Sequence, residues 1–467
     1  MDHQGARLPG SLTDRVVGEV RQRVLTRALG PGARLPSIRA FAAAMKVSKS
    51  TVVEAYERLS AEGIIRSRPG SGFYVDAPLA PLSLADLGPR LDQEVDPLWI
   101  TRQSLGRNED LLKPGCGWLP PSWMPQESLR RALRTLARAD AVALTDYGTP
   151  LGLPALRQVI VRRMLGQGIE ASPDQIILTE SGTQSLDLVC RFLIEPGDTV
   201  LVDDPCYFNF HALLRAHRAQ VVSVPHTPQG PDLELFEQAL LQHRPRLYIT
   251  NSGIHNPTGA TLSPIVAHRL LKLAERADLT ILEDDIFADF EERAAPRLAA
   301  FDGLQRVISC GSFSKTLSAS VRCGFLACRP SWVQGLADLK IATTFGGAGL
   351  SAELVLAALT DGAYRRHVVA LRARLAGARA ETSAKLKELG LTPWLEPEAG
   401  MFLWCRLPRD LDAAEVARRA LADNVVLAPG NAFSLSQTAR GFLRFNVAQC
   451  SDPRIFAVLR KAMRSAS

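Results

Sequence analysis

The sequence lacks the patterns that mark secreted, membrane and metal-binding proteins. Its eight cysteines are scattered through apolar runs, form no C-x-x-C pair and have no histidine at the spacing of a zinc site. No apolar run reaches the ~18 residues that a membrane span requires, and the first residues show no charged-then-apolar signal pattern. We therefore expect reduced core thiols, no bound metal, no membrane partner and a cytoplasmic location.

Length and charge distribution predict at least two domains. At 467 residues the chain exceeds what one hydrophobic core ordinarily sustains. The net charge is +7, and residues 1–75 alone hold twelve Lys and Arg against six Asp and Glu. Nearly all of the positive excess therefore lies in the first sixth of the chain, which predicts a polyanionic partner for that segment only.

The first 76 residues predict three helices followed by a basic hairpin. Apolar residues recur at helical spacing, and Ser48 is the expected N-cap of the third helix. Two helices joined by a tight turn suit the major groove of DNA, and the hairpin supplies a wing, although a basic helix start can also be a solvated face. The expected helices lie around residues 12–25, 38–45 and 49–59, and the strands at 64–66 and 72–75.

The motifs of this segment resemble the winged helix-turn-helix of the GntR regulators. They are L-P-S-I-R, V-S-K-S-T-V-V-x-A-Y-x-x-L-x-x-E-G and G-S-G-F-Y-V. The resemblance implies binding to double-stranded DNA, with Arg39 and Lys49 on base edges or phosphate. It also implies phosphate contacts from four hydroxyl residues and a turn near the DNA backbone: Ser37, Ser48, Ser50 and Thr51, then Gly70, Ser71 and Gly72.

A proline-bearing segment without sustained periodicity follows, and we expect it to be a tether. From about residue 175 onward, short β-rich runs alternate with helical patterns, which predicts an α/β fold with a mostly parallel sheet covered by helices. The expected strands are residues 175–178, 200–202, 221–224, 247–250, 280–282, 307–309 and 324–328. The expected divisions are a DNA-binding domain at 1–76, a linker at 77–110 and a second domain at 111–467.

Ligands of such sheets bind beyond the carboxyl ends of the strands, and residues of suitable chemistry follow several of them. Gly182, Thr183 and Gln184 open a helix whose amides and dipole suit a phosphate, although an ordinary capped helix has the same pattern. Tyr207 places a ring where a flat ligand can stack, although most such tyrosines are core residues. Asn256 offers an amide donor on a fixed turn.

An acid and a lysine follow the next two strands. Asp284 ends a buried run, where an unpaired carboxylate requires a nearby cation such as a protonated pyridine nitrogen. Lys315 follows another apolar run, where desolvation favours a neutral amine that can form a Schiff base, although a lone lysine is usually a surface charge. Ser312 and Arg322 flank it and can bind a phosphate. These are the groups that hold pyridoxal phosphate.

Ser312 and Lys315 also have the S-x-x-K spacing of β-lactamase-type acylases. Neither the Ser-Asp-Asn nor the Lys-Thr-Gly of that site occurs in the chain, so we set this interpretation aside.

The surrounding motifs resemble the fold-type I aspartate aminotransferase family. They are S-F-S-K-T-L-x-x-x-x-R, H-N-P-T-G and Y-G-x-P-x-G-x-x-x-L-R, the last at residues 147–157. With the GntR segment ahead of it, the whole chain resembles the MocR-type regulators. The resemblance implies pyridoxal phosphate as cofactor, a smaller C-terminal α+β subdomain, an amino-acid or amine effector and a homodimer built across the active sites.

Residue roles follow from the same resemblance. Lys315 would carry the internal aldimine, Asp284 would pair with the ring nitrogen, and Asn256 would bond the ring oxygen. Tyr207 would stack on the ring, and Arg444 would clamp a substrate carboxylate, although a strand arginine is often structural. The phosphate would be held by Gly182, Thr183, Gln184, Ser312 and Arg322, with Tyr147 reaching it from the partner subunit.

One residue departs from the family pattern. A tyrosine usually stands three residues after the aspartate, bonded to the ring oxygen, and here that residue is Phe287. Losing the hydroxyl should raise the aldimine pKa and weaken transamination without abolishing cofactor binding. Two functions stay open: a regulator that senses an amino compound through aldimine exchange at Lys315, and an aminotransferase with an accessory DNA-binding domain. The complete winged helix favours the regulator.

Overall fold

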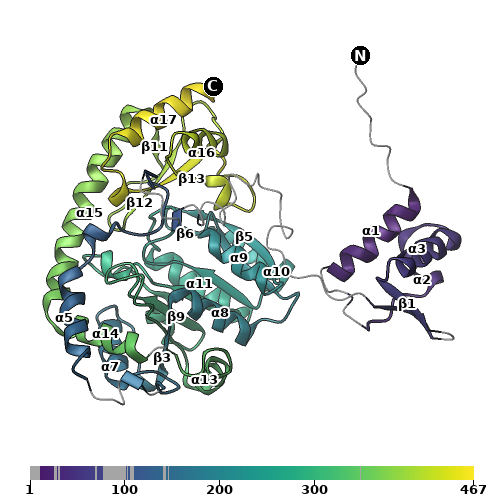
Figure 1. Ribbon diagram of the computed structural model, residues 1–467, viewed down its shortest axis with the longest axis horizontal. Coiled ribbons are helices and arrows are strands. Elements are labelled where there is room, and N and C mark those ends of the chain that lie inside the picture. The colour runs from purple at the N-terminus through teal and green to yellow at the C-terminus, as the bar shows by residue number, and fades with distance from the viewer. Residues whose placement is uncertain are drawn as a thin grey trace. The chain divides into compact units, whose positions relative to one another are not determined.

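A computed structural model gives the structure of the protein. It describes residues 11–25, 29, 32–68, 71–76, 101, 104–105, 110–139, 144–145, 147–347 and 349–466. The chain divides into two compact units, Met1–Leu84 and Ala85–Ser467 (Figure 1).

The N-terminal unit is a small helical domain with a two-stranded wing. Its helices bury one apolar core that includes Val16, Phe41, Val52 and Tyr56. The first strand extends two residues further than expected because its arginines continue to pair with the second strand. The elements are α1 (Leu12–Leu25), α2 (Ile38–Met45), α3 (Lys49–Ala61), β1 (Ile65–Arg68) and β2 (Gly72–Val75).

The large unit contains an eight-stranded sheet with the order β3-β10-β9-β8-β7-β4-β5-β6. Its strands run parallel except β10 and β6, which are antiparallel to their neighbours. All seven expected strands are present, so the predicted mostly parallel α/β fold is confirmed. The strands are β3 (Ile176–Thr179), β4 (Thr199–Asp204), β5 (Gln220–Thr227), β6 (Gly230–Pro231), β7 (Leu247–Thr250), β8 (Thr280–Asp284), β9 (Val307–Ser312) and β10 (Gly324–Ala327).

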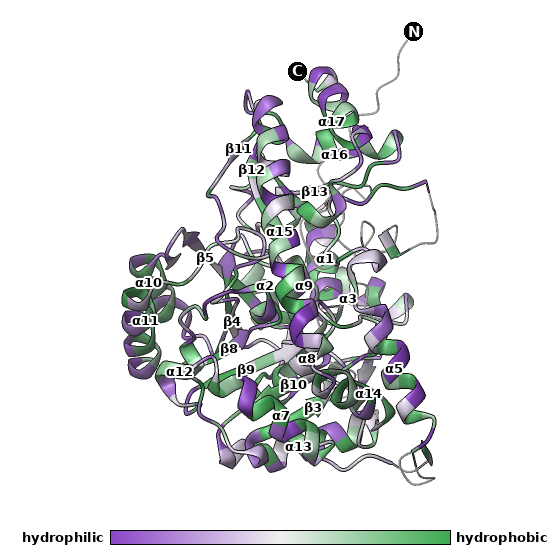
Figure 2. Cartoon of the chain, turned by 90° about the vertical axis from the view of Figure 1, so that its left-hand side faces the viewer, coloured by the Kyte–Doolittle hydropathy of each residue, from purple (hydrophilic) through white to green (hydrophobic). Residues whose placement is uncertain are grey.

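Helices cover both faces of this sheet, because its central strands are apolar on both sides. Figure 2 shows β9 and β10 coloured as hydrophobic. One face packs in a core with the helices α7, α10, α11, α12 and α14, and the other in a core with α8, α9 and α13. The helices are α7 (Pro154–Leu165), α8 (Gly182–Leu193), α9 (Phe208–Ala216), α10 (Leu233–His243), α11 (Pro264–Arg276), α12 (Leu298–Asp302), α13 (Pro330–Thr344) and α14 (Gly349–Thr360).

A smaller C-terminal subdomain completes the large unit, as expected. Its antiparallel sheet has the order β11-β12-β14-β13 and packs with three helices in a separate apolar core. The long helix α15 runs along one side of the large unit toward this sheet (Figure 1). The elements are β11 (Thr392–Pro393), β12 (Phe402–Arg406), β13 (Ala428–Pro429), β14 (Phe442–Asn446), α15 (Ala363–Glu388), α16 (Ala413–Ala422) and α17 (Arg454–Ser465).

All eight cysteines are buried free thiols, as the sequence predicted. Within the described ranges, no single helix is long and apolar enough to span a membrane; α13 and α14 meet the length and hydropathy criteria only together, as a pair bent by 117°.

Candidate functional site

Lys315 lies just beyond the end of β9, at the edge of the sheet where the sequence placed the site. Its Nζ donates a hydrogen bond to the carbonyl of Gly117 at 2.6 Å. Burial lowers the pKa of Lys315 to about 8, with Arg444 acting in the same direction and Asp284 opposing it. Roughly a tenth of such amines are neutral at pH 7, which is the nucleophilic form.

Two adjoining cavities share the Lys315 side chain. The larger, about 280 Å³, contains Asp284, Ser312 and the start of α8 in its lining. The smaller, about 80 Å³, is lined by Arg444, Asn256 and several aromatic rings. Four residues line both: Trp118, Tyr207, Ile286 and Lys315. The lysine thus stands between a polar compartment and a mostly apolar one.

The polar compartment has the donors of an anion site. Gly182, Thr183, Ser312 and Arg322 line it, and α8 directs its N-terminus there. A Cβ on Gly182 would lie 3.1 Å from the Ile286 side chain, so glycine keeps the backbone accessible. These residues are brought together as the sequence predicted, in a cavity of suitable chemistry.

Gln184 and Tyr147 lie elsewhere. The Gln184 side chain turns back to accept a hydrogen bond from the Glu180 backbone amide at 2.6 Å, and the residue is outside the cavity lining. Tyr147 is 75% exposed, and its ring packs on Phe345 at 4.9 Å beside a separate cavity. Within one chain, neither of these two side chains reaches the polar compartment.

Asp284 is the one member of the acidic run 283–285 that lines the cavity. Burial raises its pKa to about 6, and the Cys310 thiol donates to its Oδ1 at 3.8 Å. Among the described residues, no cation pairs with it directly. A buried carboxylate without a counter-charge is costly, so the position suits a ligand that brings a positive charge.

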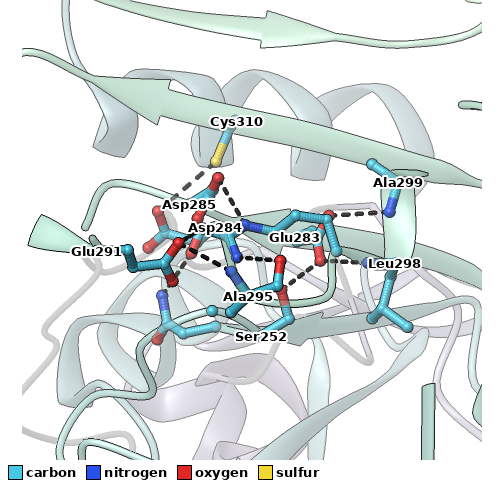
Figure 3. A network of polar contacts seen from close by, with 12 residues as sticks. Ser252, Glu283, Asp284, Asp285, Glu291, Ala295, Leu298, Ala299 and Cys310 are labelled. Atoms are coloured by element: carbon cyan, nitrogen blue, oxygen red, sulfur yellow. Dashed lines mark hydrogen bonds and ion pairs between the residues drawn. The ribbon is translucent and has the colours of Figure 1, made fainter. Parts of the chain in front are cut away.

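The acids on either side of Asp284 have structural partners (Figure 3). Glu283 accepts hydrogen bonds from the backbone amides of Leu298 and Ala299 at 2.7 and 3.0 Å, which caps α12. Asp285 forms an ion pair with the fully buried Arg297 at 2.9 Å. Arg297 also pairs with another acid of the network, Glu291, at 2.7 Å.

Arg444 closes the far end of the smaller cavity. Its Nη1 donates to Asn256 Oδ1 at 2.8 Å and its Nη2 to the Gly115 carbonyl at 2.7 Å. The guanidinium lies over the rings of Phe402 and Phe433, 4.2 and 4.8 Å from their centroids. Its Nε is buried and has no hydrogen-bond partner in the described part of the chain. An orphaned cationic donor of this kind suits an anionic ligand.

Tyr207 and Phe287 supply the aromatic walls around the lysine. The Tyr207 ring packs against Phe208 and Phe210 and lines both cavities. The Phe287 ring centroid lies 5.9 Å from Lys315 Nζ. The ring that replaces the family tyrosine therefore faces the reactive amine and offers it no hydroxyl.

A buried network of hydrogen bonds around Asp289, next to Lys315 in the chain through Thr316, was not predicted from the sequence. The Thr316 and Tyr364 hydroxyls both donate hydrogen bonds to the Asp289 carboxylate, at 3.0 and 2.6 Å. The two hydroxyl oxygens lie 2.6 Å from each other. His367 Nε2 lies 3.0 Å from the Thr316 carbonyl. Arg163 forms an ion pair with Asp289. Through these bonds, helix α15 fixes the backbone beside the lysine.

The segment of residues 115–118 was also missed. It supplies the carbonyl that binds Lys315 and a tryptophan that lines both cavities. A Cβ on Gly115 would lie 2.5 Å from the Ala428 backbone nitrogen, so only glycine allows this approach to the C-terminal subdomain. The glycine-rich pattern Gly-Cys-Gly-Trp was the available signal.

The N-terminal unit exposes basic and hydroxyl groups at the starts of α2 and α3. Arg39, Lys49 and Ser50 are exposed. Ser48 is the predicted N-cap, since its Oγ accepts from the Thr51 amide at 3.1 Å. Lys49 therefore lies at a helix N-terminus, where phosphate contacts are favoured.

The other residues predicted to contact DNA lie at the second helix and the wing. Ser37 caps α2 by accepting from the Ala40 amide at 3.2 Å. Ser71 Oγ lies 2.6 Å from the Tyr74 hydroxyl, and Gly72 is exposed with φ of 107°. Gly70 lies outside the described residues.

One group of potential metal ligands occurs in the described ranges: Asp203, His226 and His255. One ligand atom from each residue lies within 4.8 Å of the other two, and the two imidazole rings stack at 3.8 Å and 14°. Asp203 accepts from the hydroxyls of Tyr248 and Thr250 at 2.6 and 2.7 Å. Both Asp203 oxygens therefore have hydrogen-bond partners within the protein.

Comparisons with known proteins agree with this geometry. The family described as aminotransferase class I and II matches residues 114–461, and the gntR family of bacterial regulatory proteins matches residues 12–75. The uncharacterized HTH-type transcriptional regulator YdcR of Escherichia coli (strain K12) is 30% identical over 92% of this chain and 93% of its own. A 2-aminoadipate transaminase of Thermus thermophilus is 30% identical over 75% of this chain and 88% of its own.

Solved structures show the same fold in the large unit. LysN, an α-aminoadipate aminotransferase from Thermus thermophilus complexed with N-(5'-phosphopyridoxyl)-L-leucine, has a TM-score of 0.71 and 26% identity, over 82% of this chain and 99% of that chain. The chain therefore belongs to the aminotransferase class I and II family and carries a GntR-family DNA-binding domain at its N-terminus, which is the architecture of the MocR-type regulators.

Proposed function

We propose that this protein is a transcription regulator that binds double-stranded DNA through residues 1–76 and adjusts that binding to an amino compound held with pyridoxal phosphate at Lys315. One observation carries the proposal. A single chain joins a winged helix with exposed basic residues to two adjoining cavities that Lys315 shares, and no counter-ion among the described residues pairs with the Asp284 or Arg444 that line them. The linker at residues 77–110 would connect the DNA-binding domain to the sensing domain at 111–467.

The residues around the larger cavity fit pyridoxal phosphate. The unpaired Asp284 carboxylate suits a protonated ring nitrogen, and the α8 N-terminus with Ser312 and Arg322 suits the phosphate. When bound, the cofactor supplies an aldehyde and an electron-accepting ring. Lys315 Nζ is the amine placed to bond that aldehyde, and Tyr207 offers a ring for stacking.

The neighbours of Lys315 determine how it responds to an incoming amine. Asn256 Oδ1 is occupied by Arg444, which orients the amide and leaves its Nδ2 to donate toward the cofactor oxygen. Phe287 donates no hydrogen bond there. An amino compound that competes with Nζ for the aldehyde would free the lysine, and a ligand that prefers one domain arrangement would then shift the population of DNA-binding states.

The partners we propose are DNA, an amino-acid or amine effector and a second copy of the chain, in the cytoplasm. Tyr147 and Phe345 support the second copy, because their packed rings are 75% and 65% exposed. In a dimer, Tyr147 would approach the phosphate of the other subunit. An exposed aromatic pair of this kind is typical of an interface.

Aminotransferase activity is the second candidate. It is favoured by the neutral fraction of Lys315 and by the 30% identity to a 2-aminoadipate transaminase. The Phe287 ring beside Nζ argues against efficient turnover. A steady-state transaminase assay with a panel of amino acids separates the two: turnover near the typical ~10 per second would contradict a sensor without catalysis.

DNA binding by the cofactor-loaded protein tests the regulatory function. Operator binding is measured by fluorescence anisotropy with and without each amino compound. We expect the dissociation constant to change at least fivefold with the right compound, a coupling of about 1 kcal/mol. DNA binding that ignores both cofactor and amino compounds would contradict the proposal.

Variants of two exposed lysines distinguish a direct contact with DNA from the effect of removing any positive charge from the protein. Lys49→Gln should weaken binding to all DNA sequences and reduce the slope of log K against log salt by about 1. Lys461→Gln is the matched control, because Lys461 is also exposed but pairs with Asp423 in the C-terminal subdomain. An equal loss in both variants would contradict a specific role for α3.

A further inference from the structure

The walls of the smaller cavity indicate what kind of amino compound the protein takes, provided that the proposed function holds. Lys315 lines both cavities, the groups that suit the phosphate line only the larger one, and Arg444 lines only the smaller one. A compound whose amine meets Lys315 therefore extends its remaining atoms toward Arg444.

Arg444 has room for one carboxylate. Two of its nitrogens donate hydrogen bonds to Asn256 and Gly115, and two aromatic rings pack against its guanidinium. The buried Nε is the donor without a partner. No acid among the described residues pairs with Arg444, which lines the cavity, so a carboxylate placed there would form a charge-assisted bond with the guanidinium.

Among the residues that the structure describes, the other walls of this cavity offer no partner for a second charge. Phe208, Phe433, Ala428 and Pro429 are apolar, and Thr101 and Ser104 are neutral. Among the described lining residues, Lys315 and Arg444 are the only charged groups. An ammonium or a second carboxylate on the side chain would be buried unpaired, which greatly weakens binding.

The cavity is also small. Its volume is about 80 Å³. An apolar cavity of roughly 150 Å³ holds a benzene molecule, so the available space admits a side chain of only a few carbon atoms beside the carboxylate.

We propose that the effector is an α-amino acid with one carboxylate and a small, uncharged, apolar side chain, in the size range from alanine to valine. Arg444 binds the carboxylate. The phenyl rings of Phe208 and Phe433 limit the size of the amino acid's side chain.

The test is isothermal titration of the cofactor-loaded protein with five amino acids, followed in parallel by the cofactor absorbance. Alanine and valine should bind at least tenfold more tightly than glutamate, lysine or phenylalanine. Ethylamine, which lacks the carboxylate, should bind at least tenfold more weakly than alanine. Tighter binding of glutamate, lysine or phenylalanine than of alanine and valine would overturn the proposal.

A cavity variant tests the size limit separately. Phe208→Ala removes a ring from the wall and should improve phenylalanine binding at least fivefold while glutamate stays weak. Unchanged phenylalanine binding in a folded, cofactor-loaded variant would contradict the assigned wall. If none of the five amino acids changes heat or absorbance in a protein that carries the cofactor, both this inference and the sensing function fail. If the protein carries no cofactor, the proposed function fails at its first step.

Discussion

Two buried lysines in the large unit resemble each other in isolation and differ in their surroundings. Burial lowers the pKa of both Lys315 and Lys340 to about 8. Lys315 donates a hydrogen bond to the Gly117 carbonyl at 2.6 Å, and Lys340 donates one to the Pro150 carbonyl at 2.9 Å. Lys315 stands at the carboxyl ends of the strands beside unpaired charged groups. Lys340 lies on α13 and lines a largely apolar cavity of about 200 Å³.

The comparison teaches that a lowered lysine pKa does not identify a site by itself. Desolvation alone produces it in both places. The difference lies in the groups that could hold a ligand around the amine: Asp284 without a cation, Arg444 with an orphaned Nε and the N-terminus of α8. These occur around Lys315 and make its cavity the candidate cofactor site.

Removing each lysine in turn should give the largest contrast. Lys315→Ala should abolish retention of pyridoxal phosphate after desalting, because the amine that bonds the aldehyde is gone. Lys340→Met should retain it. The visible absorbance of the desalted proteins measures both. Loss of the cofactor from the Lys340 variant alone would reverse the assignment.

Lys340→Met should also change stability in a known direction. The folded-state pKa is about 8 against 10.5 in the unfolded chain, so charging Lys340 opposes folding below pH 8, and stability rises between about pH 8 and 10.5. Methionine removes this penalty and should stabilise the cofactor-free protein at pH 7 by up to about 3 kcal/mol. Urea unfolding measures the difference, and a comparable destabilisation would contradict the burial argument.

Substitutions of the neighbouring acids Asp284 and Asp285 test the difference between a ligand site and a network of ion pairs. Asp284→Asn should lower cofactor affinity at least about 100-fold. It should not destabilise the cofactor-free chain at pH 7.5. The raised pKa of Asp284 means that its ionised carboxylate opposes folding, an effect that grows between about pH 4 and 6 and stays constant above that. Burial raises the pKa of Asp285 as well, to about 7, but here the loss of an ion-pair partner by the buried Arg297 outweighs that effect, so Asp285→Asn should cost about 3 kcal/mol of stability.

Cofactor titration and urea unfolding of both variants give the two quantities. The interpretation fails if the roles are exchanged, with Asp284→Asn unfolding the protein and Asp285→Asn removing the cofactor.

The network around Asp289 predicts a smaller effect. Thr316→Val removes the hydroxyl bonded to Asp289 and should slow cofactor capture about tenfold and shift its pH midpoint, because the lysine backbone is less firmly held. Thr316→Ser keeps the hydroxyl and should restore both. Stopped-flow absorbance across pH measures them. An equal defect in both variants would indicate a packing role for the threonine methyl group.

The smallest effect concerns pH in the unmodified protein. The fraction of neutral Lys315 should rise about tenfold per pH unit below pH 7 and level off above about 8. The rate of cofactor capture should follow it. A rate that keeps rising toward pH 10.5 would show that the reacting amine is an ordinary exposed lysine.

The sequence predicted the parts of the site that depend on local order along the chain. Asp284 and Lys315 were found because Asp284 ends one buried strand and Lys315 follows another, and the parallel sheet brings those strand ends to one edge. The approach of Gly117 to Lys315 was missed, since it joins residues 198 positions apart. Gln184 could not be placed from its motif, because its amide is used within its own turn. The buried pairing of Asp285 with Arg297 likewise depends on tertiary packing.

Reductive trapping tests the central claim most directly. The purified protein is loaded with pyridoxal phosphate, reduced with borohydride, digested, and mapped by mass spectrometry. The account predicts one phosphopyridoxyl group per chain, on Lys315, and none on Lys340. A label on Lys340 or on an exposed lysine, or no label at all, would contradict it.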